Sequence, residues 1–279
     1  MKLPEFYVDE IIKTALSEDI NYIDLASDYL LDDNNISTAS FISKADGILC
    51  GIDVALRVFA IVDKDITFNI MIHDGEKVTM GDTIATVSGK TKSILKAERT
   101  SLNLLQHMSG IATETAKYVE CCEGTSCHVC DTRKTLVGMR ALQKYAVVTG
   151  GGKNHRFNLS DAAMLKDNHI DAYGGITAAV EALREKIGHM VKIEVEVRNF
   201  EELWEALNTK CDVIMLDNMT TEQMAECVKI AGGRSVLEAS GNITLANARE
   251  IAKTGVDMFS VGALTHSVKA FDISLKINK

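Results

Sequence analysis

Three short clusters of cationic and amide side chains lie between residues 131 and 170. They are Arg133-Lys134, Asn154-His155-Arg156 directly after Gly150-Gly151-Gly152, and Lys166-Asp167-Asn168-His169. A guanidinium offers a planar pair of donors to a carboxylate or phosphate, a lysine offers a point charge, and consecutive glycines let backbone N–H groups turn toward an anion. A single Arg-Lys pair is more often part of a solvated loop. Three such clusters in one short stretch predict a site for a ligand with several negative charges.

Two carboxylates, Glu194 and Glu196, share one face of a predicted strand. If that face lines a barrel, the two charges are costly unless cations or a metal meet them. With Asp217 at the next strand tip, they offer the oxygen ligands that Mg²⁺ prefers. The alternative is that one glutamate forms an ion pair with Lys134 or Lys166, and it applies to Glu194 more readily than to Glu196 or Asp217.

Two glycine turns follow the last predicted strands. Ser240-Gly241-Asn242 leads into a helix that is expected to begin near Thr244. The same pattern of strand, glycine and helix occurs a second time at Val261-Gly262. A strand, a glycine turn and a helix N-terminus together form a seat for a phosphate group. Barrels that bind phosphorylated sugars often carry such seats on their last two units. Because every α/β loop favours glycine, the turns are weak evidence alone and support a phosphosugar site only together with the clusters above.

From residue 162 onward, short apolar runs alternate with helical segments, as repeated βα units do. The predicted strands are 162–165, 191–197, 213–216, 236–237 and 258–261, and the helices between them are 176–187, 201–207, 221–230 and 244–253. In an α/β barrel all C-terminal strand tips meet at one face, where active sites lie. The cations, carboxylates and glycine turns follow these tips, so we predict that they converge.

The pattern of apolar residues and turn signals in the N-terminal part predicts a small α/β sandwich domain. Residues 5–17 show the helical spacing of apolar side chains, and residues 37–90 read as short strands separated by turn signals. Within that stretch, 41–45, 66–72 and 84–87 are the expected strands, and 54–62 is a helix candidate.

A long helix is predicted over residues 97–121. Arg99 falls in its expected first turn, beside Glu98, where a cation faces the unfavourable end of the helix dipole. This placement gives Arg99 no evident local role.

The composition narrows the function classes. With 279 residues, 46% hydrophobic and 25% charged, the chain can form one α/β barrel or two smaller domains. A net charge of −9 argues against a general affinity for nucleic acid or anionic membranes. The most apolar run, 48–62, is interrupted by Asp53 and Arg57, so no membrane span is expected. Because residues 1–5 contain no apolar signal core, we expect a cytoplasmic protein.

Seven cysteines in scattered positions do not suit a disulfide framework. Cys127 and Cys130, with Cys121 and Cys122 upstream, raise a zinc or redox hypothesis, yet no second ligand pair at comparable spacing is evident. Passive thiols are therefore the default interpretation, and the role of this cluster stays open.

The clusters resemble motifs of the quinolinate phosphoribosyltransferase family. The matching runs occur in order, at 98–113, 131–135, 144–146, 150–156, 166–169, 194–196, 216–218 and 238–241. Asn154-His155-Arg156 and Lys166-Asp167-Asn168-His169 are the most specific of them. The resemblance implies transfer of phosphoribosyl from phosphoribosyl pyrophosphate to quinolinate, with loss of CO₂, giving nicotinate mononucleotide and pyrophosphate in NAD biosynthesis. It also implies Mg²⁺ as the cofactor.

The resemblance further implies an α/β fold with an N-terminal α/β sandwich domain and a C-terminal, incomplete, TIM-like α/β barrel. We expect the sandwich at residues 1–103, joined by the segment 268–279, and the barrel at residues 104–267. The family forms homodimers or multiples of dimers.

The roles of individual residues follow from the same resemblance. The two carboxylates of quinolinate are held by Arg133, His155, Arg156 and Lys166, with Arg99 supplied by the neighbouring subunit. The catalytic residues are Lys134, which lies between the two substrates, and Glu196 and Asp217, which serve the ribose and Mg²⁺. These three also bind phosphoribosyl pyrophosphate, together with Ser240, Gly241 and Gly262.

The sequence departs from the family in two loops. Leu136-Val137-Gly138-Met139-Arg140 replaces a run that usually contains Thr-Pro-Gly-Leu-Arg, and residues 21–26 lack the usual glycines. One alternative is a related phosphoribosyltransferase of the molybdenum-transport type with another acceptor. Another is a non-catalytic phosphosugar or metal-binding protein. The runs at 154–156 and 166–169 favour quinolinate.

Overall fold

The computed structural model describes residues 3–278 as two compact units. Among the described residues, unit 1 comprises 3–116, 135–151 and 264–278, and unit 2 comprises 117–134 and 152–263. No helix within residues 3–278 has the length and apolarity needed to cross a bilayer.

An antiparallel sheet in the order β12-β1-β5-β3 forms the centre of unit 1. Its strands are β1 (Ile36–Ser43), β3 (Thr67–Ile70), β5 (Thr83–Lys90) and β12 (Ile273–Ile277), and a separate pair consists of β2 (Gly47–Ile48) and β4 (Lys77–Val78). Strand β12 pairs with β1, with Leu275 opposite Phe41. The C-terminal segment therefore completes the sheet of the N-terminal part.

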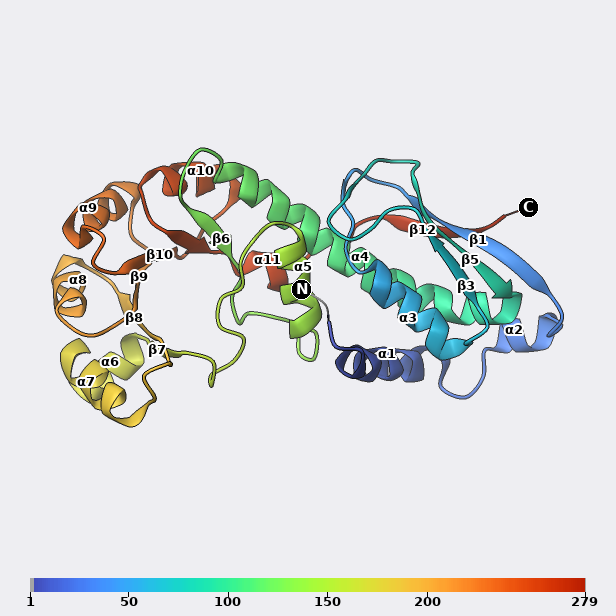
Figure 1. The fold of residues 1–279 in the computed structure, drawn as a ribbon, viewed down its shortest axis with the longest axis horizontal. Helices are drawn as coiled ribbons and strands as arrows, with labels where there is room; N and C mark the ends of the chain where they lie inside the picture. Colours follow the sequence, from blue (N-terminus) through green and yellow to red (C-terminus); the bar gives the residue numbers. More distant parts are fainter. Residues whose placement is uncertain (1–2, 279) are drawn as a thin grey trace. The chain divides into compact units, whose positions relative to one another are not determined.

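Aromatic packing fixes α3 on this sheet. The helices of unit 1 are α1 (Glu5–Ile20), α2 (Leu25–Leu30), α3 (Ile52–Val62) and α5 (Arg140–Thr149), and α4 (Thr91–Cys121) begins there. The Phe59 ring of α3 lies 5.9 Å from that of Phe41 and 5.2 Å from that of Phe68, edge-on in both cases. Edge-to-face pairs add to the hydrophobic gain of burial, so the apolar face of α3 covers the sheet. Figure 1 shows α3 alongside the sheet.

Helix α4 begins at Thr91, directly after β5, and not at residue 97 as predicted. Tertiary hydrogen bonds anchor its first residue: Thr91 N donates to Asn35 O at 2.8 Å, and its hydroxyl lies 2.7 Å from that of Ser37. Arg99 therefore lies in the third turn, and the prediction that it occupies the first turn was wrong. The helix-dipole argument does not apply to it. The boundary expected between residues 103 and 104 falls inside this helix.

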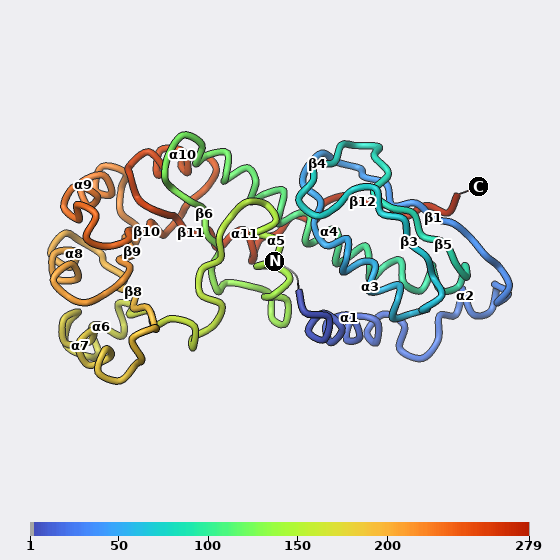
Figure 2. Tube along the Cα trace, viewed as in Figure 1, coloured from blue at the N-terminus to red at the C-terminus, as the bar shows by residue number. Residues whose placement is uncertain are grey.

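Six parallel strands form the sheet of unit 2, in the order β6-β11-β10-β9-β8-β7. They are β6 (His128–Cys130), β7 (Ala163–Leu165), β8 (Ile193–Val197), β9 (Val213–Asp217), β10 (Val236–Ser240) and β11 (Met258–Ser260). The helices are α6 (Asp167–Tyr173), α7 (Ile176–Lys186), α8 (Phe200–Leu207), α9 (Thr221–Ala231) and α10 (Leu245–Lys253), followed by α11 (Ala263–His266) at the boundary. Helices α7 to α10 lie outside an arc of strands (Figure 1), and Figure 2 follows the alternating path.

The barrel is incomplete, as expected. Strands β6 and β7 are the two ends of the strand order, and β6 is extended by an isolated parallel bridge between Cys130 and Lys153. Parallel strands that are each followed by an outer helix place their C-terminal tips at one edge of the sheet. Apart from Arg99, which belongs to unit 1, the predicted site residues lie along that edge.

All seven cysteines are free thiols. Cys122 and Cys127, which flank the turn between α4 and β6, share a hydrogen bond. This contact lowers the pKa of the Cys122 thiol and raises that of Cys127, where burial acts in the same direction.

Candidate active site

A cavity of about 290 Å³ opens at the strand tips of unit 2. It is lined by Thr132, Arg133, Lys134, His155, Arg156, Met164, Lys166, Met215, Ser240 and Ser260. Each cationic cluster singled out in the sequence contributes to this lining. The structure thus brings together side chains that are far apart in the chain.

The cations in this cavity are held close to one another. Burial lowers the pKa of the Arg156 guanidinium, and the charge of Arg133 lowers it further. Arg156 Nη1 donates to Ala162 O at 2.7 Å, which fixes its position. The buried Nε of Arg133 has no hydrogen-bond partner. Such a cluster favours an anionic ligand, which would relieve the repulsion between the guanidinium groups.

His155 connects these cations to two buried carboxylates. Its Nε2 lies 3.0 Å from Glu194 Oε2 and 3.5 Å from Glu238 Oε2, and its Nδ1 accepts a hydrogen bond from Arg156 N at 2.8 Å. The backbone N of His155 donates to Asp131 Oδ1 at 2.9 Å. The ring therefore has a protein partner at each nitrogen, and it orients the segment that carries Arg156.

Glu238 belongs to the site although the sequence analysis did not include it among the site residues. Burial raises the pKa of its carboxyl group to about 7, and the charge of Glu194 contributes to this rise. One oxygen of each carboxyl group is buried without a hydrogen-bond partner. The signal in the sequence was its position two residues before Ser240, which puts both side chains on the same face of β10.

The ligand atoms of His155, Glu194 and Glu238 lie within 4.8 Å of one another, a spacing that could hold a metal ion. His155 Nε2 already lies between the two carboxylates, at 3.0 Å from Glu194 Oε2 and 3.5 Å from Glu238 Oε2, so the space at their centre is taken by the imidazole ring. This trio is distinct from the predicted metal ligands, Glu196 and Asp217.

Lys166 pairs with Glu196, not with Glu194. Its Nζ lies 3.4 Å from Glu196 Oε2. From the sequence, an ion pair with this lysine was considered for both glutamates and was favoured for Glu194 over Glu196. Glu194, which precedes Glu196 on the same face of β8, pairs with His155 instead. Burial raises the pKa of Glu196, Lys166 lowers it, and the charge of Asp217 raises it. The carboxylates of Glu196 and Asp217 are therefore close enough to repel each other.

The two glycine turns lead into helices of different length. Gly241 has φ = 99° and precedes α10, whose N-cap residue Thr244 exchanges hydrogen bonds with Asn247. Gly262 precedes α11, which has only four residues. Because a helix dipole grows with the number of aligned peptides, the seat at Gly241 has the stronger N-terminus behind it.

Arg99 differs from the other predicted site residues in the unit to which it belongs. It is exposed and belongs to unit 1, whereas the remaining ones belong to unit 2.

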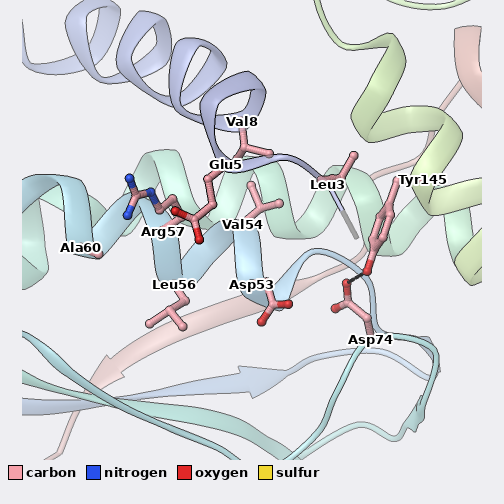
Figure 3. Close-up of a pocket in the computed structure, with 10 residues that line it drawn as sticks. All are labelled: Leu3, Glu5, Val8, Asp53, Val54, Leu56, Arg57, Ala60, Asp74 and Tyr145. Atoms are coloured by element: carbon pink, nitrogen blue, oxygen red, sulfur yellow. Dashed lines mark hydrogen bonds between the residues drawn. The ribbon is translucent and has the colours of Figure 1, made fainter. Parts of the chain in front are cut away.

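A larger cavity, of about 410 Å³, lies in unit 1 (Figure 3). The side chains around it include the carboxylates Glu5, Asp53 and Asp74. The Tyr145 hydroxyl donates to Asp74 at 2.8 Å, and the Arg57 that lines the cavity is engaged by a neighbouring aspartate. This acidic lining does not suit a polyanionic ligand, so the smaller cationic cavity is the candidate site.

Comparison with known proteins decides the family. The model of the quinolinate phosphoribosyl transferase N-terminal domain matches residues 24–109, and that of its C-terminal domain matches residues 111–276. The chain belongs to the quinolinate phosphoribosyltransferase family.

Relatives within the quinolinate phosphoribosyltransferase family align over nearly the full length. A probable nicotinate-nucleotide pyrophosphorylase (carboxylating) of Synechocystis is 41% identical over 277 residues, which are 98% of this chain and 94% of the relative. The one from Bacillus subtilis is 41% identical over 260 residues, covering 93% and 90%. The solved nicotinate-nucleotide pyrophosphorylase of Francisella tularensis matches with a TM-score of 0.96 at 42% identity, covering 99% and 98%. The expected fold of a sandwich domain and an incomplete barrel is confirmed.

Proposed function

We propose that this chain transfers the phosphoribosyl group of phosphoribosyl pyrophosphate to quinolinate, releasing pyrophosphate and CO₂. The product, nicotinate mononucleotide, enters NAD biosynthesis. The observation that carries this proposal is the cationic cavity at the strand tips, in a chain about 41% identical to enzymes named for this reaction. The relatives give no support to an acceptor of the molybdenum-transport type or to a non-catalytic role.

Quinolinate is a flat dianion, and its two carboxylates suit the three cations Arg133, Arg156 and Lys166. The guanidinium groups give planar pairs of donors, and Lys166, which also lines the cavity, adds a point charge. His155 supports this set through its Nδ1, which accepts the backbone N–H of Arg156. Together these groups orient the pyridine nitrogen toward the ribose.

Glu196 and Asp217 fit a hard divalent cation. They are carboxylates that repel each other, and one of them is partly desolvated, so an added cation would stabilise both. These residues would hold Mg²⁺. When bound, Mg²⁺ supplies positive charge that offsets the charge of the departing pyrophosphate.

The residues of the chain act mainly through positioning and electrostatics. The turns at Ser240-Gly241 and Gly262 seat the 5′-phosphate, and Lys134 lies between the two substrates. The pyridine nitrogen attacks the ribose C1 as the bond to pyrophosphate breaks. The pyridinium then accepts the electron pair of the breaking carbon–carbon bond when the neighbouring carboxylate leaves as CO₂, and a proton takes its place on the ring.

We further propose a homodimer, or a multiple of dimers, in which Arg99 completes the quinolinate site of the neighbouring subunit. Its exposure on α4 in unit 1 leaves the guanidinium available to a second copy of the chain. The seven free thiols suit the reducing cytoplasm, where we place the enzyme.

The test compares quinolinate with nicotinate, which lacks one carboxylate. Each charge-assisted hydrogen bond contributes roughly 1.5–3 kcal/mol, so the loss of two should lower kcat/KM by several powers of ten. We expect purified protein with phosphoribosyl pyrophosphate and Mg²⁺ to consume quinolinate and not nicotinate. Comparable turnover of nicotinate would contradict the assignment.

A further inference from the structure

Two asparagines adopt the left-handed backbone conformation at neighbouring strand tips of unit 2. Asn218, directly after β9, has φ = 53°, and Asn242, after β10, has φ = 51°. Among the described residues, Asn21 is the other non-glycine residue with a positive φ. Such conformations persist only where the surroundings enforce them, and they concentrate at functional sites.

Asn218 joins the tips of β9 and β10 through its backbone and both ends of its side chain. Its backbone N donates to Ser240 O at 2.9 Å. Its Nδ2 donates to Asp217 Oδ2 at 2.8 Å, and its Oδ1 accepts from Asn242 Nδ2 at 3.2 Å. Asp217, Asn218 and Asn242 thus form one connected chain of hydrogen bonds.

The shape of the turn depends on the same side chain. A β-carbon at Gly241 would collide with Asn218 Oδ1, so glycine is needed where the asparagine packs against the turn. Asn242 connects the turn to α10, because its carbonyl oxygen accepts a hydrogen bond from Asn247 Nδ2 at 3.1 Å. The hydrogen-bonded chain therefore ends at the helix that backs the phosphate seat.

We propose that Asn218 is a positioning residue that holds the Asp217 carboxylate and the Ser240–Asn242 turn in one fixed arrangement. The inference rests on the proposed function, in which Asp217 would hold the Mg²⁺ that offsets the charge of the departing pyrophosphate, and the turn serves the 5′-phosphate at the other end of the same substrate. A carboxylate has about four acceptor positions, so Asp217 can accept from Asn218 and still bind a cation. Asn218 fixes the distance between the two ends of one substrate and leaves the quinolinate cations untouched.

The experiment uses Asn218→Gly, because glycine keeps the positive φ and removes only the amide. Asn218 is exposed, so the variant should fold with an unchanged melting temperature. We expect the Kd of phosphoribosyl pyrophosphate, measured by calorimetry with Mg²⁺ and no acceptor, to rise at least about tenfold, the range for a hydrogen bond to a charged group. The Kd of quinolinate should stay within about twofold. Asn21→Gly, the same substitution at a residue of unit 1 that also has a positive φ, of 54°, is the matched control and should behave as the parent.

A second pair of variants tests the connection itself. Asn242→Gly breaks the far end of the hydrogen-bonded chain and should also weaken phosphoribosyl pyrophosphate binding. The double variant should bind about as poorly as Asn218→Gly alone, because both changes interrupt one unit. Fully additive losses would overturn the connection, and an unchanged Kd in Asn218→Gly would overturn the positioning role. A parent protein that binds no phosphoribosyl pyrophosphate would instead contradict the proposed function.

Discussion

The ammonium nitrogen of Lys166 lies 3.4 Å from Glu196 Oε2, so the predicted quinolinate cations and the predicted metal carboxylates meet in one contact. The lysine side chain is 51% exposed and the glutamate 12%. Only the lysine end of this ion pair is exposed, so the loss of Lys166 would leave the largely buried Glu196 carboxylate in need of another cation. In the proposed function, a carboxylate of quinolinate replaces Glu196 as the partner of Lys166.

Glu196→Gln should affect the binding of the two substrates differently. It removes a carboxylate that we assign to the ribose and Mg²⁺, so kcat/KM for phosphoribosyl pyrophosphate should fall by roughly a hundredfold or more. The Kd of quinolinate should stay the same or decrease, because Lys166 loses a competing anion. Steady-state kinetics and calorimetry give the two values, with the exposed Glu201→Gln as the control. Equal weakening of both substrates would contradict this division of roles.

Arg99→Ala should lose most activity while the fold and the dimer persist. The sharper test mixes it with Lys134→Ala, whose lesion lies in unit 2. In a mixed dimer with shared sites, one site carries both lesions and the other carries neither. Random mixing should then restore about one quarter of the parental activity, since half of the dimers are mixed and one of their two sites is intact. Confirmed subunit exchange without recovery would rule out a shared site.

Glu238→Gln should change how stability depends on pH. The pKa of Glu238 is raised to about 7 by burial and by the charges of Glu194 and Asp131, while His155 and Ser260 act in the opposite direction. A raised carboxyl pKa means that its stabilising contribution is complete below the ordinary carboxyl range and is lost as pH rises through about 7.

Glutamine mimics the protonated carboxyl group and does not titrate. Calorimetric melting at pH 5 and pH 8 gives the free energy of unfolding of both proteins. Between these two pH values, the difference between variant and parent should shift in favour of the variant by on the order of 3 kcal/mol. Glu201→Gln, on the exposed side of α8, should show no such trend. A difference between Glu238→Gln and the parent that is independent of pH would show that the carboxyl group is ionised throughout.

Replacing Cys121, Cys122, Cys127 and Cys130 together with alanine should leave activity within a few-fold. The thiols of Cys127 and Cys122 are hydrogen-bonded to each other. Cys130 is the last residue of β6. Elemental analysis of the parent should find less than about one zinc per ten chains, since a structural zinc site would be filled stoichiometrically. Stoichiometric zinc would overturn the interpretation of these thiols as passive.

The repeating units were predictable because their signal is local. The apolar runs that become β8 and β9 were placed within two residues of their observed starts, and α9 began at the predicted residue. Glycine at 232, with φ = 55°, ended α9 as its backbone conformation requires. Convergence of the strand tips followed from topology alone, and it brought Arg133, His155 and Lys166 to one cavity.

The features that the sequence could not supply depended on tertiary contacts. Helix α4 starts early because Thr91 bonds to Asn35, a residue that lies far earlier in the chain. Strand β6 has three residues with a histidine and a cysteine, too few for a periodic pattern. The choice between Glu194 and Glu196 as the partner of Lys166 depends on which carboxylate His155 already occupies, and spacing along one strand carries no such information.

The central claim is that one active site couples phosphoribosyl transfer to decarboxylation. Quinolinate labelled with ¹³C in the carboxylate next to the ring nitrogen, incubated with the protein, phosphoribosyl pyrophosphate and Mg²⁺, tests it directly. We predict one labelled CO₂ and one nicotinate mononucleotide for each pyrophosphate released, and none without phosphoribosyl pyrophosphate. Release of pyrophosphate without labelled CO₂, or no loss of quinolinate at all, would contradict the account.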